Sequence, residues 1–222
     1  MSELILKTLV GSRAHGIASE GADYDYRGVY ITPTSELLSL FSTNKKTQWI
    51  EGGDDNTSWE ISHFCFLATK CNPTILEALV APVISMTDEG EQLRRLFPCF
   101  LDSKAIYCAF SGYSHNQMKK MMDGAISAKG SHWTKFAAAY IRVLWQGIKL
   151  LQTGNLPVEL DDDMKKKIMA IKKWECDRGD AIKLADYYRC QFERMADITE
   201  DKFTQDIDKI NKFILDIRRK HW

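Results

Sequence analysis

The sequence predicts an α/β (α+β) front end with a small mixed sheet, followed by a C-terminal helical region. Before about residue 61, short β-rich runs alternate with turn residues, whereas after it apolar residues recur at helical spacings of three and four. The chain has 222 residues, of which 45% are apolar, and this suits a compact catalytic domain with a helical appendage. We therefore expect two domains, 1–100 and 101–222.

The front end begins with two strong strand signals. Leu4–Val10 reads as a strand that enters the turn Gly11-Ser12, and Tyr24–Ile31 reads as a second strand, stopped by Thr32-Pro33. Weaker strand signals follow at Thr47–Glu51 and Thr57–Glu60, separated by a Gly- and Asp-rich turn over residues 52–55.

Helical signals take over at Ile61–Lys70. Asn72 and Pro73 then form a typical helix start, with Asn as the N-cap and Pro at the first helical position, and this helix ends near Pro82.

In the rear half, a helix is predicted over Ser103–Met122. A second predicted helix follows it and ends at Gly154-Asn155. A final helix carries an apolar face that begins at Phe203 and includes Ile217, and it ends in three cations that suit the helix dipole. The clearest apolar stripe of the chain lies on the helix before Gly154: Trp133, Phe136, Ala137, Tyr140, Leu144, Ile148 and Leu151.

Charge and cysteine content narrow the class of protein. Lys+Arg and Asp+Glu both number 30, so the chain has no overall basic field for nucleic acid, although a local basic patch is compatible with this balance. No apolar run approaches the roughly 20 residues that span a bilayer, and the N-terminus does not resemble a signal peptide.

The six cysteines are scattered without a C-x-x-C pair, which favours buried, reduced thiols in a cytoplasmic protein over a zinc site.

The segment with the clearest chemistry runs from Gly11-Ser12 to Asp23 and Asp25. A strand that enters a Gly-Ser turn can present backbone N–H groups and a hydroxyl to a phosphate. Two aspartates two residues apart on a strand point to the same face, with Cα atoms roughly 6.5–7 Å apart. Carboxylates so placed can share a cation such as Mg²⁺, which prefers oxygen ligands. This combination favours phosphoryl or nucleotidyl transfer.

The residues G-S-R-A-H-G, then D-Y-D-Y-R-G after six further residues, resemble the signature of the polymerase-β nucleotidyltransferase superfamily. More narrowly, the chain is similar to predicted nucleotidyltransferases of bacteria and phages, which also carry the later pattern N-P-T-x-L-E, here Asn72 to Glu77. The resemblance implies a nucleotidyltransferase core that uses Mg²⁺, with Mn²⁺ as the alternative. It also implies transfer of a nucleoside monophosphate from a nucleoside triphosphate such as ATP, with release of pyrophosphate.

By this resemblance, Gly11 and Ser12 would hold the β- and γ-phosphates, and Asp23 and Asp25 would be metal ligands. The superfamily also uses a third carboxylate, which helps to hold a metal and acts as a base toward the acceptor hydroxyl. We expect Glu60 in that role because it ends a strand candidate, with Asp55 as the alternative.

Three further residues flank the phosphate region. Arg13 and Arg27 could pair with the triphosphate, and for Arg27 the alternative is a salt bridge to one of the aspartates. His15 is expected to contact a phosphate or to order the loop. Glu77 is expected at a surface position of its helix.

Two other classes of function remain open. A glycosyltransferase could use D-x-D to hold a metal–diphosphate, but only one strand precedes Asp23, which is too few for that class. A degenerate fold that only binds a nucleotide or a partner is the second alternative, and metal-dependent turnover would separate it from an enzyme. Within the enzyme reading, the acceptor could be an RNA end, a protein side chain or a small molecule, because fold and motif do not decide among them.

Overall fold

The computed structural model describes residues 2–40, 46–48, 56–123 and 133–222. Its contacts divide the chain into two compact units. The sheet unit combines residues up to Leu101 with Thr204–Trp222, and the helical unit is Asp102–Phe203. This division differs from the expected domains 1–100 and 101–222 in the last helix, which belongs to the sheet unit because its apolar face packs there.

In the described residues, five strands form one mixed sheet in the order β3-β4-β2-β1-β5. The central strand β1 pairs antiparallel with β2 and with β5, whereas β2 and β4 are parallel. The strands are β1 (Glu3–Val10), β2 (Asp25–Ile31), β3 (Thr47–Gln48), β4 (Thr57–Glu60) and β5 (Val83–Met86). The predicted α/β class with a small mixed sheet and a helical rear half is confirmed.

Strand β5 was not predicted, because the sequence after residue 61 was expected to be helical throughout. Its four residues are all exposed, so no alternation of apolar and polar residues marks it. It forms by backbone pairing along the free edge of β1. The predicted strand Thr47–Glu51 is described only at Thr47–Gln48, and its remainder lies outside the described residues.

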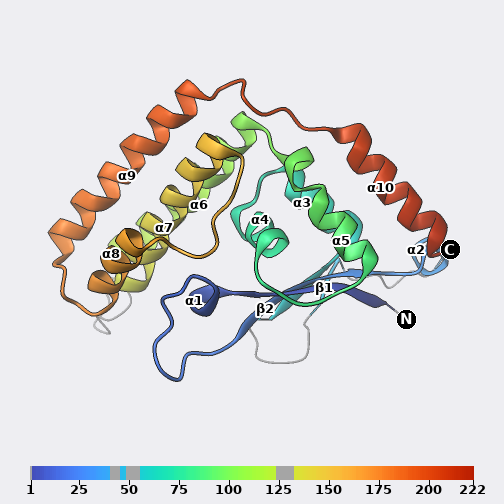
Figure 1. Ribbon diagram of the computed structural model, residues 1–222, viewed down its shortest axis with the longest axis horizontal. Coiled ribbons are helices and arrows are strands. Elements are labelled where there is room, and N and C mark those ends of the chain that lie inside the picture. The colour runs from blue at the N-terminus through green and yellow to red at the C-terminus, as the bar shows by residue number, and fades with distance from the viewer. Residues whose placement is uncertain (1, 41–45, 49–55, 124–132) are drawn as a thin grey trace. The chain divides into compact units, whose positions relative to one another are not determined.

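Helices α3 (Ile61–Thr69), α4 (Pro73–Val80) and α5 (Asp88–Arg95) lie on one side of the sheet (Figure 1). A hydrogen bond joins α4 to β1, since the Thr8 hydroxyl donates to the carbonyl of Ala78 on α4 at 3.0 Å. The predicted cap of α4 is confirmed: the Asn72 side chain accepts from the Thr74 amide at 3.0 Å, and Pro73 opens the helix. The short helices of this unit are α1 (Gly11–Ala14), α2 (Thr34–Leu37) and the 3₁₀ turn Phe97–Phe100.

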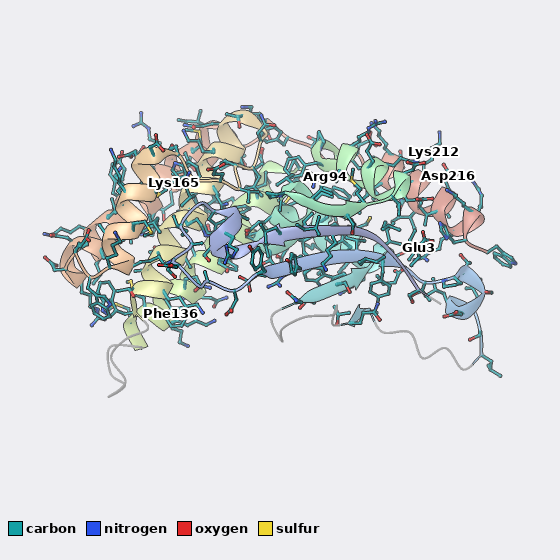
Figure 2. All side chains as sticks on the ribbon, turned by 60° about the horizontal axis from the view of Figure 1, so that its bottom comes forward. Glu3, Arg94, Phe136, Lys165, Lys212 and Asp216 are labelled. Atoms are coloured by element: carbon teal, nitrogen blue, oxygen red, sulfur yellow. The ribbon has the colours of Figure 1, made fainter. Side chains whose placement is uncertain are left out.

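Arg94, labelled in Figure 2, ties α5 to the end of α4. Its guanidinium donates to the carbonyls of Ala81, at 2.8 Å, and Val80, at 3.2 Å. These carbonyls lie at the C-terminal end of α4, where backbone acceptors have no partner within the helix. The side chain thus fixes the angle between two helices that cover the sheet.

Helix α10 (Ile207–Lys220) completes the sheet unit. It buries Ile210, Phe213 and Ile217, while Lys212 and Asp216 stand on its exposed face (Figure 2). It begins four residues later than the apolar face that was predicted to start at Phe203.

The end of α10 is anchored by charge as well as by packing. Lys220 forms an ion pair with the buried carboxylate of Glu89 on α5. The hydrogen bond from Lys220 is the main cause that lowers the pKa of Glu89 to about 2.

The helical unit consists of α6 (Ser103–Asp123), α7 (Trp133–Thr153), α8 (Asp162–Lys172) and α9 (Arg178–Ile198) (Figure 1). The predicted stripe on α7 is confirmed, because all of its residues except the half-buried Phe136 are buried. Gly154 ends α7 with a φ of +75°, a conformation that favours glycine. Within the described residues, none of the helices is long and apolar enough to cross a membrane.

All six cysteines lie in described parts of the chain, and none of them is in a disulfide. Only Cys65 and Cys71 are buried as expected, whereas Cys108 and Cys190 are exposed. Burial raises the pKa of the Cys65 thiol to about 12, so this group stays protonated at neutral pH.

Candidate active site

The Gly-Ser turn and the second aspartate of D-x-D meet at the end of β1. Val10, the last residue of β1, pairs with Asp25, the first residue of β2. Gly11 follows with a φ of +72°, and a Cβ atom built on it would lie 2.2 Å from Oδ2 of Asp25. Glycine is therefore required here both for its backbone conformation and for the space that the carboxylate occupies.

Arg13, on the short helix α1, holds the segment that carries Asp23. Its Nε and Nη2 atoms donate to the carbonyl of Ala22 at 3.0 and 2.6 Å. Its guanidinium carbon also lies 3.9 Å from the ring centroid of Tyr24. Asp23 itself is exposed and lies just before β2 begins. Arg13 thus contacts the residue on each side of Asp23, whereas the sequence had suggested a contact with the triphosphate.

His15, which follows the short helix α1, is buried against α4. Its side chain is only 6% exposed, and its Nε2 lies 2.6 Å from Oε1 of Glu77 on α4. Glu77, expected at a surface position, is itself 13% exposed in its side chain. The two residues tie α4 to the turn after β1, so the ordering role expected for His15 fits its position better than a phosphate contact does.

Arg27 follows Asp25 by two residues on β2 and therefore shares its face of the strand. Its Nη1 donates to the carbonyl of Tyr26 at 2.9 Å. Its partner across the sheet is Thr8 on β1. Of the two arginines predicted to contact the triphosphate, Arg27 lies on the same strand as Asp25, whereas Arg13 lies on α1.

The structure does not bring Glu60 to the aspartates. In the parallel pairing of β2 with β4, Glu60 is aligned with Tyr30, five residues along β2 from Asp25. At roughly 3.3 Å per residue, this separation is about 16 Å. Glu60 instead caps α3 by accepting from the Ser62 amide at 2.8 Å, and it pairs with Nη2 of Arg218 at 2.5 Å. The expected role of Glu60 as third metal ligand is therefore not supported, because the carboxylate has a structural role at the far end of the strand.

The alternative third carboxylate, Asp55, lies outside the described residues. The residue after it in the chain, Asn56, is described and is 2% exposed. Its Oδ1 accepts from the backbone amide of Tyr26 at 2.7 Å, next to Asp25. Sequence reasoning missed Asn56, which read only as part of a polar turn. Among the described residues, no group of three acidic, histidine or cysteine side chains is placed to hold a metal ion.

In the described residues, a five-stranded mixed sheet carries helices on one face, and the Gly-Ser turn after β1 packs against Asp25 of the D-x-D motif. This arrangement is consistent with a polymerase-β-type nucleotidyltransferase. A family model agrees: the RNA repair pathway DNA polymerase beta family matches residues 2–216, and the chain belongs to this family. None of the curated proteins compared with the chain matches it.

Proposed function

We propose that the protein is a magnesium-dependent nucleotidyltransferase that moves a nucleoside monophosphate from a nucleoside triphosphate to a hydroxyl at an RNA end. The observation that carries the proposal is the contact between the Gly11 turn and the Asp25 carboxylate. It brings the turn that we propose to bind phosphate next to a carboxylate that we propose to bind the metal. RNA is preferred as acceptor because the family is described as belonging to an RNA repair pathway.

The residues present fit a magnesium site. Asp23 and Asp25 supply carboxylate oxygens, the ligands that Mg²⁺ prefers, and both are at least partly accessible. These two residues would hold the ion. When bound, it would neutralise charge on the triphosphate and lower the pKa of the attacking hydroxyl.

The chain's own groups would then orient the reactants. The acceptor oxygen attacks the α-phosphorus, the bond from that phosphorus to the oxygen bridging to the β-phosphate breaks, and pyrophosphate leaves. A carboxylate must take the proton of the acceptor hydroxyl. Asp55 is our candidate for this base, because its described neighbour Asn56 lies beside the start of β2. Arg27, two residues from Asp25 on β2, would contact a phosphate from the same face of the strand.

The test is incubation of the protein with each α-³²P-labelled nucleoside triphosphate and Mg²⁺. Total RNA, lysate protein and no acceptor are compared in parallel. We expect label on RNA, and we expect Asp25→Asn to abolish it while the fold is retained. Label on protein or on a small molecule would reject RNA as acceptor but keep the transferase.

A binding module without catalysis is the second candidate. It is favoured by the position of Glu60, which leaves the third carboxylate undefined within the described residues. Magnesium-dependent nucleotide binding without any transfer, unchanged when acceptors are added, would support this candidate and refute the enzyme.

A further inference from the structure

A cavity lies in the sheet unit, at the end of β4 that is far from Asp25. It encloses about 520 Å³, within the range of about 300–1,000 Å³ that small-molecule sites occupy. We call it the α3 pocket, and its walls include Lys46, Glu60, Ser62, His63, Phe66 and Arg218. The nucleotidyl-transfer site described above uses none of these residues, so the pocket needs an explanation of its own.

The floor of the α3 pocket is a fixed ion pair. Nη2 of Arg218 lies 2.5 Å from Oε1 of Glu60 and 2.6 Å from the Ser62 hydroxyl. Its Nη1 donates to the carbonyl of Thr32 at 3.1 Å. The side chains of Arg218 and Glu60 are 15% and 7% exposed. Because these charges are buried together and hydrogen-bonded, the floor is neutral overall and has a set geometry.

The mouth of the pocket has a different character. Phe66 on α3 is 57% exposed, so the face of a large aromatic ring is accessible at the pocket wall. The Lys70 Nζ lies 5.4 Å from its ring centroid, and the exposed residue Lys46 lines the same pocket. Arg218 neutralises Glu60. The charged side chains that remain in the pocket wall and beside the aromatic ring are Lys46 and Lys70, and both are positive.

An exposed aromatic ring with one lysine beside it and a second lysine lining the same cavity matches the chemistry of a nucleotide in a single strand. The base can stack on the ring, and the phosphates can lie near the lysines. An acidic peptide would also be attracted by the lysines, but it would leave the exposed ring without a flat partner. The charge and the aromatic surface together therefore favour nucleic acid.

We propose that the α3 pocket binds an upstream nucleotide of the single-stranded RNA acceptor, with its base on Phe66 and its backbone near Lys46 and Lys70. The proposal rests on the proposed function in taking RNA as the acceptor. The register of β2 and β4 places Glu60, in the floor of the pocket, about 16 Å from Asp25 along the strand direction. The pocket thus holds the acceptor at a point distant from the reacting end.

Binding measured without turnover tests this proposal independently of catalysis. A 5′-fluorescent single-stranded RNA is titrated with the protein in the absence of nucleoside triphosphate, and its anisotropy is followed. Phe66→Ala should weaken binding roughly 5- to 100-fold, since a base stacked on an aromatic ring contributes on that scale. Phe66→Trp should restore the affinity, because it keeps a stacking surface.

Two further variants test whether Lys46 contacts a phosphate and whether the effect of Phe66 is specific to the α3 pocket. Lys46→Ala should lower the slope of log affinity against log salt by about 0.7, the value for one phosphate contact on a single strand. Tyr187→Ala is the matched control, because Tyr187 is 56% exposed but lies on α9 in the helical unit. It should bind RNA as the wild type does.

The outcomes separate this proposal from the proposed function. RNA binding that is unchanged in Phe66→Ala, or no RNA binding by the wild type, overturns the α3 pocket as an acceptor site. RNA binding that depends on Phe66, in a protein that transfers no nucleotide, supports the pocket and refutes the transferase. Peptide binding that competes with RNA and depends on Lys46 but not on Phe66 would overturn the stacking role.

Discussion

Substitution of Gly11 by alanine tests whether the turn after β1 positions the Asp25 carboxylate. The new Cβ would lie 2.2 Å from Asp25 Oδ2, whereas an ordinary contact is at least 3.4 Å, so the carboxylate or the turn must move by about 1 Å. A misplacement of this size in a catalytic group can cost about 100-fold in rate. The positive φ adds about 1–2 kcal/mol of backbone strain for alanine, which lowers Tm by about 2–8 °C in a chain of this length.

Gly21→Ala is the matched control for this strain. Gly21 has a φ of +77°, close to the +72° of Gly11, but a Cβ there meets nothing within 4 Å among the described atoms. Nucleotide transfer is measured with saturating Mg²⁺ below the Tm of both variants. We expect similar losses of Tm, with the large loss of rate confined to Gly11→Ala. Equal rates in the two variants would refute the view that the turn sets the position of Asp25.

Three further predictions follow from the contacts around the site. Asp55→Asn should reduce the kcat of transfer by several orders of magnitude. Glu60→Gln should leave the kcat of folded protein within about threefold and lower the urea midpoint, because it weakens a buried ion pair. Arg13→Gln should raise the Mg²⁺ concentration needed for half-maximal transfer, as measured by metal titrations, without changing the KM for the nucleotide, because the Arg13 guanidinium contacts the residue on each side of Asp23. Glu89→Gln should lower the free energy of unfolding at pH 7 by about 1–3 kcal/mol. Since the folded pKa of Glu89 is lowered from 4.5 to about 2, this contribution is fully present above about pH 4.5 and is lost as the pH falls toward 2. Urea unfolding of the wild type and the variant at pH 7, 4 and 3 should therefore show a difference that shrinks with acid.

The sequence predicted the elements that local patterns define. Strands β1, β2 and β4, the capped start of α4 and the stripe on α7 all follow from alternation, capping residues or helical spacing, and the structure has them within a residue or two. Strand β5 was missed because an exposed edge strand depends on pairing with β1, which no local pattern encodes.

The candidate site shows the same limit at the level of single residues. The meeting of Gly11 with Asp25 could be predicted, because the motif places both at the ends of neighbouring strands. The position of Glu60 could not be predicted from the sequence, because it depends on the register between β2 and β4. Its partner Arg218 is separated from it by more than 150 residues of sequence. The contact between His15 and Glu77 likewise depends on how α4 packs against the turn.

The register between β2 and β4 also sets a length requirement on the acceptor. Asp25 begins β2, and Glu60 in the floor of the α3 pocket is aligned with Tyr30 near its end. Because strands in a packed sheet keep their spacing, the separation of about 16 Å between these points is fixed. An RNA acceptor can enter the α3 pocket, whose wall includes Phe66, only if it reaches at least about that far from the reacting end. A dinucleotide acceptor should therefore be extended at the same rate by the wild type and by Phe66→Ala, whereas an acceptor of ten nucleotides should show a raised KM in the variant with an unchanged kcat. A raised KM for the dinucleotide as well would mean that Phe66 acts at the reacting end, and it would contradict the placement of the pocket along the strand.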